Sequence, residues 1–181
     1  FPYTTLFRSG SAKLEACMDL VTAAVEGGHR ILLFSQFTSM LELLAKRLDE
    51  AGVSHFTLQG STPKPVRAEL VRRFNSGEAD VFLISLRAGG TGLNLTAADI
   101  VIHYDPWWNV AAQNQATDRA YRIGQRNPVQ VYKLIAQDTI EEKIVELQQA
   151  KQDLAETVTG SADGVILSMK PEELLQLLQE E

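Results

Sequence analysis

Short apolar runs alternate along this sequence with longer segments in which apolar residues recur every three or four positions. Runs such as Ile31-Leu32-Leu33-Phe34 have the wholly apolar composition of strands that are covered on both faces. The segments between them have the period of amphipathic helices. This alternation predicts an α/β domain around a mostly parallel sheet, with its working residues in loops beyond the carboxyl ends of the strands.

The same pattern gives the expected elements. Strands are predicted at residues 31–34, 53–58, 81–84, 100–102 and 129–135. Helices are predicted at about 11–26, 37–51, 65–74, 110–123 and 139–158, with a linker at 160–164 before a short terminal helix at 169–181. The residues expected to face the core along these helices are Leu14, Met18, Val21, Val25, Phe37, Leu41, Leu44, Leu48, Val66, Leu70, Phe74, Ile140, Ile144, Leu147, Leu154 and Val158.

Length and composition limit the class of protein. The chain has 181 residues, 45% of them apolar, which suits one domain with a real core and a small extension. No apolar run approaches the ~20 residues of a membrane-spanning helix, so no membrane partner is expected. A single cysteine favours an intracellular protein, cytoplasmic or nucleoid-associated in a bacterium and nuclear in a eukaryote. Three scattered histidines add no structural zinc site, and no metal ligand is assigned.

The formal net charge of −6, taken whole, argues against a nucleic-acid-binding protein. The charge is unevenly distributed, because residues 1–138 hold 14 basic and 13 acidic side chains whereas residues 139–181 hold 3 and 10. The acidity therefore belongs to the C-terminal segment. The rest of the chain is expected to bind DNA weakly by itself, with a small dependence on salt.

The loop after the third predicted strand, residues 85–95, has three glycines within four positions. Glycine permits tight turns and close backbone approach, so N–H groups there could cradle a phosphate. The loop is not a P-loop, because the chain contains no Gly-Lys-Ser/Thr. A tight bend after the strand explains the glycines equally well.

Gln115, Arg119 and Arg122 lie on one stripe of the helix predicted at 110–123. Small alanines, Ala116 among them, form a second stripe that lets this helix lie close to the sheet. Two guanidinium groups in register suit a phosphate chain, because each is permanently charged and donates in a fork. By pattern alone, a solvated arginine face or ion pairs with Asp118 explain the stripe better.

Polar side chains also follow the first two predicted strands. Ser35 and Gln36 come after the first strand, and Gly60 and Ser61 come after the second. Such groups could contact a phosphate backbone, although a helix N-cap is the plainer role for Ser35. The basic residues of the third predicted helix, Arg67 among them, are best explained as a solvated face.

Both tryptophans of the chain, Trp107 and Trp108, follow the fourth predicted strand. An exposed tryptophan could stack on a base. By pattern alone, core packing is the better explanation for both. Cys17 falls in the first predicted helix without a basic neighbour in the pattern, so no reactive thiol is expected.

In order, these segments resemble the C-terminal helicase lobe of Swi/Snf-type DNA translocases, within superfamily 2. The resemblance covers about Ser11 to Leu154. It rests on the stretches ILLFSQFTSMLELL, LQGST, VFLISLRAGGTGLNLTAADIVIHYDPWWN, QATDRAYRIGQ and VQVYKLIAQDTIEEKI. Several long matches in the family's order are far more specific than a single motif.

The resemblance implies a three-layer RecA-like domain with a mostly parallel central sheet, followed by a C-terminal helical extension. It divides the chain into an unmatched, extraneous or disordered leader at 1–10, the lobe at 11–138, a brace-like helix at 139–158, and a linker with a short terminal helix at 159–181. It also implies a first RecA-like lobe as partner, with ATP and Mg²⁺ held mainly by that first lobe.

Site residues follow from the resemblance. In the family, the arginines of a Gln-x-x-Asp-Arg-x-x-Arg motif reach the ATP phosphates, which makes Arg119 and Arg122 the catalytic candidates and Arg122 the usual finger. Gly92 and Gln115 are carried over as residues of the ATP cleft. The positions that match contacts to double-stranded DNA, to its backbone rather than its sequence, are Ser35, Gln36, Gly60, Ser61, Asn94 and Trp108.

Two departures from the family pattern stand out. Tyr121 replaces a frequent histidine, which matters little for phosphate contact, and Val110 replaces a frequent proline, which leaves the tryptophan loop less rigid.

Because these 181 residues lack the phosphate-binding lysine and the acidic pair for Mg²⁺, the chain alone is predicted to hydrolyse ATP negligibly. The alternative is a non-catalytic interaction module that keeps the lobe fold. A free-standing nucleotide-binding enzyme is disfavoured, since no Gly-x-Gly-x-x-Gly follows the first strand.

Overall fold

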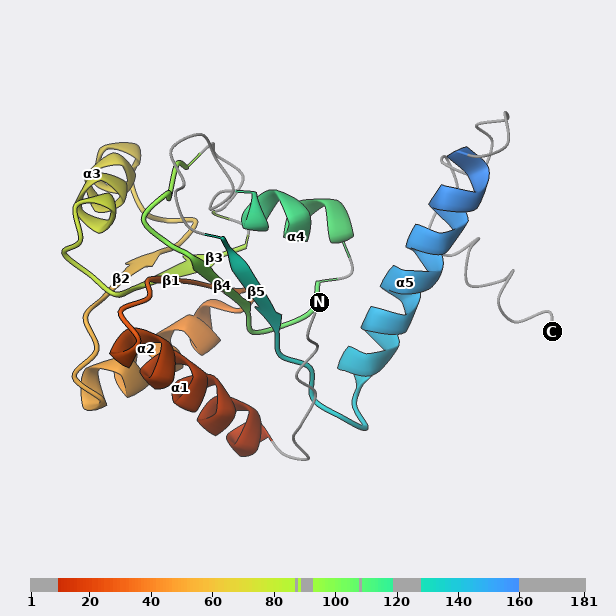
Figure 1. Cartoon of the computed structure of the whole chain (residues 1–181), viewed down its shortest axis with the longest axis horizontal. Helices are drawn as coiled ribbons and strands as arrows, with labels where there is room; N and C mark the ends of the chain where they lie inside the picture. The colour runs from red at the N-terminus through yellow and green to blue at the C-terminus, as the bar shows by residue number, and fades with distance from the viewer. Residues whose placement is uncertain (1–9, 87, 89–92, 108, 119–127, 160–181) are drawn as a thin grey trace.

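The computed structural model describes residues 10–86, 88, 93–107, 109–118 and 128–159 (Figure 1). Five strands form one sheet in the order β2-β3-β1-β4-β5. Their bounds are β1 Ile31–Ser35, β2 His55–Leu58, β3 Val81–Ser85, β4 Ile100–His103 and β5 Gln130–Lys133. Every neighbouring pair of these strands is parallel, so the predicted parallel sheet is confirmed.

The strands end almost level with one another. Ser35 at the end of β1 pairs in register with Ser85 at the end of β3. Phe34 pairs with His103 at the end of β4. The loops that leave these ends therefore start from neighbouring points along one edge of the sheet, which is called the carboxyl edge below.

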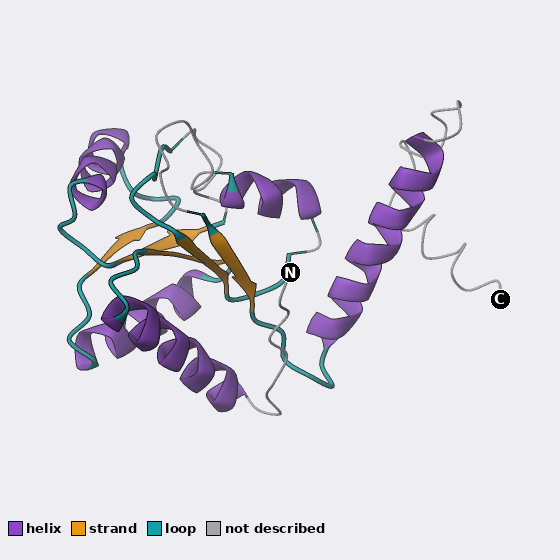
Figure 2. Cartoon of the chain, in the orientation of Figure 1, coloured by secondary structure: helices purple, strands orange, loops and turns teal. Residues whose placement is uncertain are grey.

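Helices cover both faces of the sheet, giving three layers (Figure 2). One face carries α1 Gly10–Glu26 and α2 Thr38–Glu50, and the other carries α3 Lys64–Asn75 and α4 Val110–Thr117. A fifth helix, α5 Ile140–Thr159, lies to one side of these layers, beyond β5 in the view of Figure 1.

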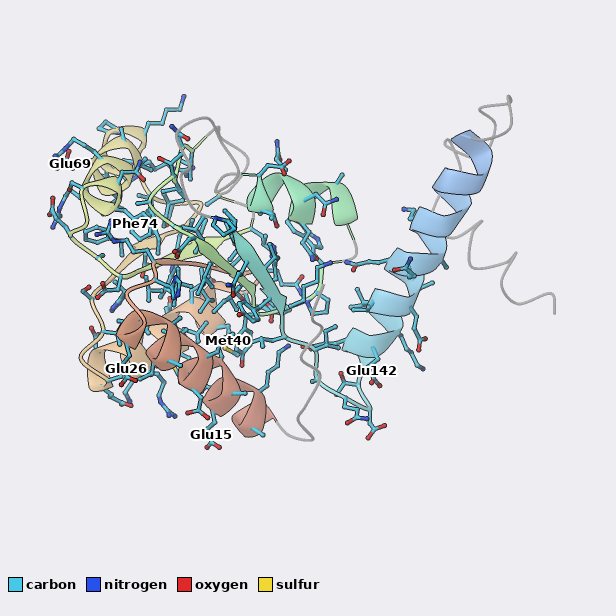
Figure 3. All side chains as sticks on the ribbon, viewed as in Figure 1. Glu15, Glu26, Met40, Glu69, Phe74 and Glu142 are labelled. Atoms are coloured by element: carbon cyan, nitrogen blue, oxygen red, sulfur yellow. The ribbon has the colours of Figure 1, made fainter. Side chains whose placement is uncertain are left out.

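Each face of the sheet has its own hydrophobic core. Successive residues of β1 point to opposite faces, so Leu33 joins the core under α1 and α2 whereas Phe34 joins the core under α3 and α4. All five residues of β1 are buried, as expected of a central parallel strand. On α3, Phe74 points toward the sheet and Glu69 points away from it (Figure 3).

Several predicted core positions are wrong. Phe37, Val66, Ile140 and Leu147 are 55%, 46%, 71% and 45% exposed. Phe37 precedes α2, Val66 and Ile140 lie in the first turns of α3 and α5, and Leu147 lies off the face of α5 that packs. Ser35 is not the N-cap of α2. That helix begins at Thr38, with Phe37 in the cap position and no side-chain cap.

Some boundaries also differ. Strands predicted at 53–58 and 129–135 are shorter, at His55–Leu58 and Gln130–Lys133. The helix predicted at 110–123 ends earlier, because α4 spans Val110–Thr117 and Asp118 is already a turn. The rest of the prediction, at 119–123, lies outside the described residues. The leader predicted at 1–10 and the linker with its terminal helix predicted at 159–181 are each wrong by one residue, because α1 begins at Gly10 and α5 ends at Thr159. Residues 1–9 and 160–181 lie outside the described ranges. Within the described ranges, no helix has both the length and the apolar character needed to span a bilayer.

Candidate functional site

The carboxyl edge gathers most of the residues that the sequence singled out. Ser35 and Gln36 follow β1, Gly60 and Ser61 follow β2, and Asn94 belongs to the segment after β3. The topology places these three loops side by side, since β2, β3 and β1 are neighbours in the sheet. Gly92, Trp108, Arg119 and Arg122 lie outside the described residues.

Asp105, which follows β4, fixes the loop after β1. Its Oδ2 accepts the Ser35 hydroxyl at 2.5 Å and the Gln36 backbone N–H at 3.0 Å. Ser35 is fully buried, whereas Gln36 is partly exposed. The structure therefore gives the Ser35 hydroxyl an internal partner and leaves the Gln36 side chain at the edge of the protein.

The loop after β2 presents Gly60 and Ser61 to solvent, since both are exposed. The loop is closed by a bond from Thr62 N–H to Gln59 O at 3.1 Å and one from Gln59 N–H to Thr62 Oγ1 at 3.0 Å. These bonds hold the two exposed residues at the tip of a short, closed turn.

Asn94 is exposed, and its backbone is held by the end of α3. The Asn75 side-chain amide donates to Asn94 O at 2.8 Å, while the Asn75 side-chain oxygen accepts Ala97 N–H at 3.2 Å. Asn75 therefore fixes the far end of the glycine-rich segment that begins after β3.

The helix α4 is anchored to the sheet through His103 and Thr117. His103 Nε2 lies 2.9 Å from Thr117 Oγ1, and the imidazole stacks on the Phe34 ring with centroids 5.5 Å apart. Burial, and secondarily the charge of Lys133, lower the pKa of His103 to about 3, so the ring is neutral. Gln115 is exposed on the same helix, two residues before Thr117.

The other end of α4 is tied to the tryptophan loop and to α5. Gln113, 2% exposed, accepts the Trp107 N–H through Oε1 at 3.2 Å. The buried amide of Gln148 on α5 donates to Trp107 O and lies 3.4 Å from Gln113 Oε1. Trp107 itself packs against the core under α3 and α4, which agrees with the core-packing explanation for this residue.

The first turn of α5 is held by a second contact. Lys13 on α1, only 5% exposed, donates to both carboxylate oxygens of Glu141, at 2.7 and 2.5 Å. Glu141 Oε2 also accepts the Ala136 N–H at 2.7 Å. The Lys13 ammonium lies 4.9 Å from the centre of the Tyr104 ring. The helix is thus joined to α1 and to the loop after β5.

Sequence reasoning missed the residues that hold these loops in place. Asp105, Gln113 and Gln148 were not singled out, and His103 is one of the three histidines to which no site was assigned. Arg67 was explained as part of a solvated face, yet it donates to four backbone carbonyls. For Asp105, a carboxylate just after a strand was the available signal, but its partner Ser35 lies 70 residues away in sequence. Gln148 likewise lies 41 residues from its partner Trp107. Among the described residues, no cluster of acidic, histidine or cysteine side chains could hold a metal ion.

Comparison with known proteins gives consistent matches. The family model described as helicase conserved C-terminal domain matches residues 12–124. A protein of Mycoplasma pneumoniae named "Uncharacterized ATP-dependent helicase" is 42% identical over 170 residues, covering 93% of this chain and 16% of that protein. The human SWI/SNF-related matrix-associated actin-dependent regulator of chromatin subfamily A member 1 is 39% identical over 185 residues, covering 98% of this chain and 18% of that protein. The chain thus spans less than a fifth of the length of these two relatives.

A solved structure is also similar. The crystal structure of the C-terminal part of the Fun30 ATPase domain matches with a TM-score of 0.72 and 36% sequence identity. The match covers 75% of this chain and 44% of that one.

Proposed function

This chain belongs to the helicase conserved C-terminal domain family, with SWI/SNF-type ATP-dependent helicases as its homologues, and we propose that it is the second motor lobe of an ATP-dependent translocase on double-stranded DNA. The family predicted from the sequence motifs is confirmed. The α/β fold is the predicted RecA-like one. ATP hydrolysis, DNA binding and a partner lobe are the proposed part.

The placement of α4 carries the proposal. Thr117 is fixed on the sheet by His103, and the Arg119-x-x-Arg122 segment follows within two residues. Gln115, at the start of the same motif, is exposed on this helix. Because α4 ends beside His103 at Thr117, we propose that Arg119 and Arg122, which follow in sequence, act from the carboxyl edge.

In the proposed reaction, Arg119 and Arg122 approach the phosphates of ATP bound to a first lobe. Their guanidinium groups stabilise the negative charge that builds on the transferring phosphoryl group. Gln115 and Gly92 line the same cleft. Mg²⁺ would be held by the first lobe, because the residues described here offer no acidic cluster for it.

DNA would lie along the carboxyl edge. Gln36, Gly60, Ser61 and Asn94 are all partly or fully exposed there, and backbone amides and short polar side chains are common donors to phosphates. Such contacts do not read sequence. Trp108 is proposed to lie against the DNA, and Ser35 acts through its bond to Asp105 rather than at the protein's exterior.

The test is a fusion of a first helicase lobe, with its phosphate-binding lysine, ahead of Ser11. We expect duplex DNA to stimulate ATP hydrolysis by the fusion and not by the 181-residue chain alone. Arg122→Ala in the fusion should lower kcat by about 10³-fold or more, the usual effect of removing an arginine finger. Arg72→Ala is the control, since Arg72 is exposed and pairs with Glu69 on the outer side of α3.

Two results would contradict the proposal. DNA-stimulated turnover by the 181-residue chain alone would remove the need for a first lobe. Wild-type turnover in the Arg122→Ala fusion would refute the finger assignment. A folded fusion that binds duplex DNA but hydrolyses no ATP would instead support a non-catalytic interaction module.

A further inference from the structure

The Arg67 guanidinium holds backbone carbonyl groups from two loops of the carboxyl edge. Nε donates to Thr62 O at 2.7 Å, and Nη2 donates to Gly60 O at 2.8 Å and to Gln59 O at 3.3 Å. Nη1 donates to Ala88 O, in the segment after β3, at 3.3 Å. Arg67 therefore shapes the loop after β2 and ties it to the glycine-rich segment.

The direction of these carbonyls sets the direction of the neighbouring amides. In a trans peptide, the C=O of one residue and the N–H of the next point in opposite directions, and the described chain has no cis peptide bond. Because Gln59 O and Gly60 O point to the guanidinium, the N–H groups of Gly60 and Ser61 point away from it. Both residues are exposed, and within the described ranges neither N–H has a hydrogen-bond partner.

Space and charge both suit an anion at these two amides. A Cβ added at Gly60 would meet nothing within 4 Å, so the approach to the turn is open. The guanidinium behind the turn is permanently charged and adds a positive potential on the same side of the sheet. The turn is also closed by its own hydrogen bonds, so its shape does not depend on a bound ligand.

We propose that Arg67 is a positioning residue, which turns the Gly60 and Ser61 amides outward to receive a phosphate of the DNA backbone without contacting the DNA itself. That the ligand is a phosphate of DNA rests on the proposed function. The effect of Arg67 on the orientation of the turn does not depend on that function. Arginine is required because its planar fork reaches several carbonyls at once, whereas the compact ammonium of lysine cannot.

The chain offers matched controls on the same helix. Arg72 is exposed, and within the described part of the chain its guanidinium donates only to Glu69 on α3, at 2.9 and 2.7 Å. Replacing Arg72 by lysine therefore makes the same chemical change as Arg67→Lys without touching the turn. Comparing the two variants separates loss of the fork from any general effect of the substitution.

The first experiment needs no DNA. In ¹H–¹⁵N spectra of the 181-residue chain, Arg67→Lys should shift the Gly60 and Ser61 amide resonances and speed their hydrogen exchange, whereas Arg72→Lys should leave them in place. Matching melting temperatures for the two variants would show that the fold is kept. If the two loop amides are unchanged in both Arg67→Lys and Arg67→Ala, the positioning role is wrong, whatever the chain binds.

The second experiment measures duplex DNA binding at several salt concentrations. We expect Arg67→Lys to weaken binding by about 3- to 10-fold, the size of one lost hydrogen-bonded contact, without changing the slope of log K against log salt. Wild-type affinity in Arg67→Lys, together with a slope smaller by about 0.9 in Arg67→Ala, would indicate a direct phosphate contact and overturn the proposal. A wild-type chain that binds no duplex at low salt would count against the proposed function, while the spectra still decide the role of Arg67.

Discussion

The Ser35 hydroxyl donates to Asp105 Oδ2 over 2.5 Å, in a buried contact between the end of β1 and the segment after β4. The same oxygen accepts the Gln36 N–H at 3.0 Å, and the Ser35 oxygen accepts the Phe37 N–H at 3.2 Å. Burial raises the pKa of Asp105, although these bonds oppose the rise. One carboxylate thus sets the path of the chain from β1 into α2.

Asp105→Ala is expected to lower the free energy of unfolding by about 1–3 kcal/mol, because two donors lose their buried acceptor. Asp105→Asn keeps an acceptor oxygen and should lose clearly less. Urea denaturation measures both values. Asp19→Ala, at an exposed position on α1, serves as control and should change stability by less than about 0.5 kcal/mol. Equal losses in the alanine and asparagine variants would mean that the hydrogen bonds do not carry the effect.

The Lys13–Glu141 pair makes a second stability prediction, since it joins α1 to the first turn of α5. The Lys13 side chain is 6% exposed and that of Glu141 is 21% exposed. Lys13→Met should lower the free energy of unfolding by roughly 2 kcal/mol. This lies between the ~0–1 kcal/mol of an exposed ion pair and the ~3–5 kcal/mol lost when a fully buried pair is broken. Adding Glu141→Gln should recover part of this loss, because the amide oxygen can still accept the Ala136 N–H. A double variant less stable than Lys13→Met would contradict the assignment.

Gln148 and Gln113 are expected to act as one unit, because both meet at the Trp107 backbone. In a double-mutant cycle with alanine at each position, the two losses of stability should be non-additive by about 0.5–1.5 kcal/mol. Chemical denaturation of the wild type, the two single variants and the double variant measures the coupling free energy. Strict additivity would show that α5 and α4 are held independently of each other.

The architecture could be predicted from the sequence because it depends on local period. The apolar runs at β1, β3 and β4 are buried on both faces, and the helical stripes through Leu41 and Phe74 face the core as predicted. Where the prediction of core positions was wrong, at Phe37 and Ile140, the residue continues a helical stripe beyond the part of the helix that packs. Period alone does not say where packing ends.

The candidate site was predictable only in part. Motif spacing placed Gln36, Gly60 and Asn94 at strand ends, and parallel topology brought those ends together. The residues that hold the loops were not predictable, because their partners are far along the chain. Asp105 lies 70 residues from Ser35. Arg67 lies close in sequence to the loop after β2. A helical pattern does not, however, indicate that its guanidinium will donate to the backbone carbonyls of that loop.

Cys17 should be unreactive in the native chain. Its thiol is fully buried in α1, and burial raises its pKa to about 12, although Lys13 one turn earlier lowers it. A basic neighbour is therefore present, contrary to the sequence analysis, but burial outweighs it. In the native protein, a thiol reagent should modify Cys17 no faster than the protein opens locally to expose the thiol. In the urea-unfolded protein, the reagent should modify Cys17 as fast as it modifies a free thiol. Fast modification of the folded chain would contradict the buried placement.

His103 predicts how stability depends on pH. Its pKa is lowered to about 3 in the folded state, by burial first and by Lys133 second, from an unfolded value near 6.5. Well above pH 6.5 the residue is neutral in both states, so its contribution to the free energy of unfolding does not change with pH. Between pH 6.5 and 3 the unfolded chain takes up a proton that the folded chain does not, so the free energy of unfolding falls as the pH falls, by up to ~1.4 kcal/mol per pH unit.

Carboxyl groups also titrate at acidic pH, so the effect of His103 is isolated by comparison with His103→Asn. Urea denaturation at several pH values should show that the stability difference between wild type and variant is constant above pH 7. Below pH 6, the wild type should lose stability relative to the variant. A His103 imidazole that titrates in the folded chain between pH 5 and 7 by NMR would contradict the prediction, because the ring between Phe34 and Thr117 would then accommodate a charge.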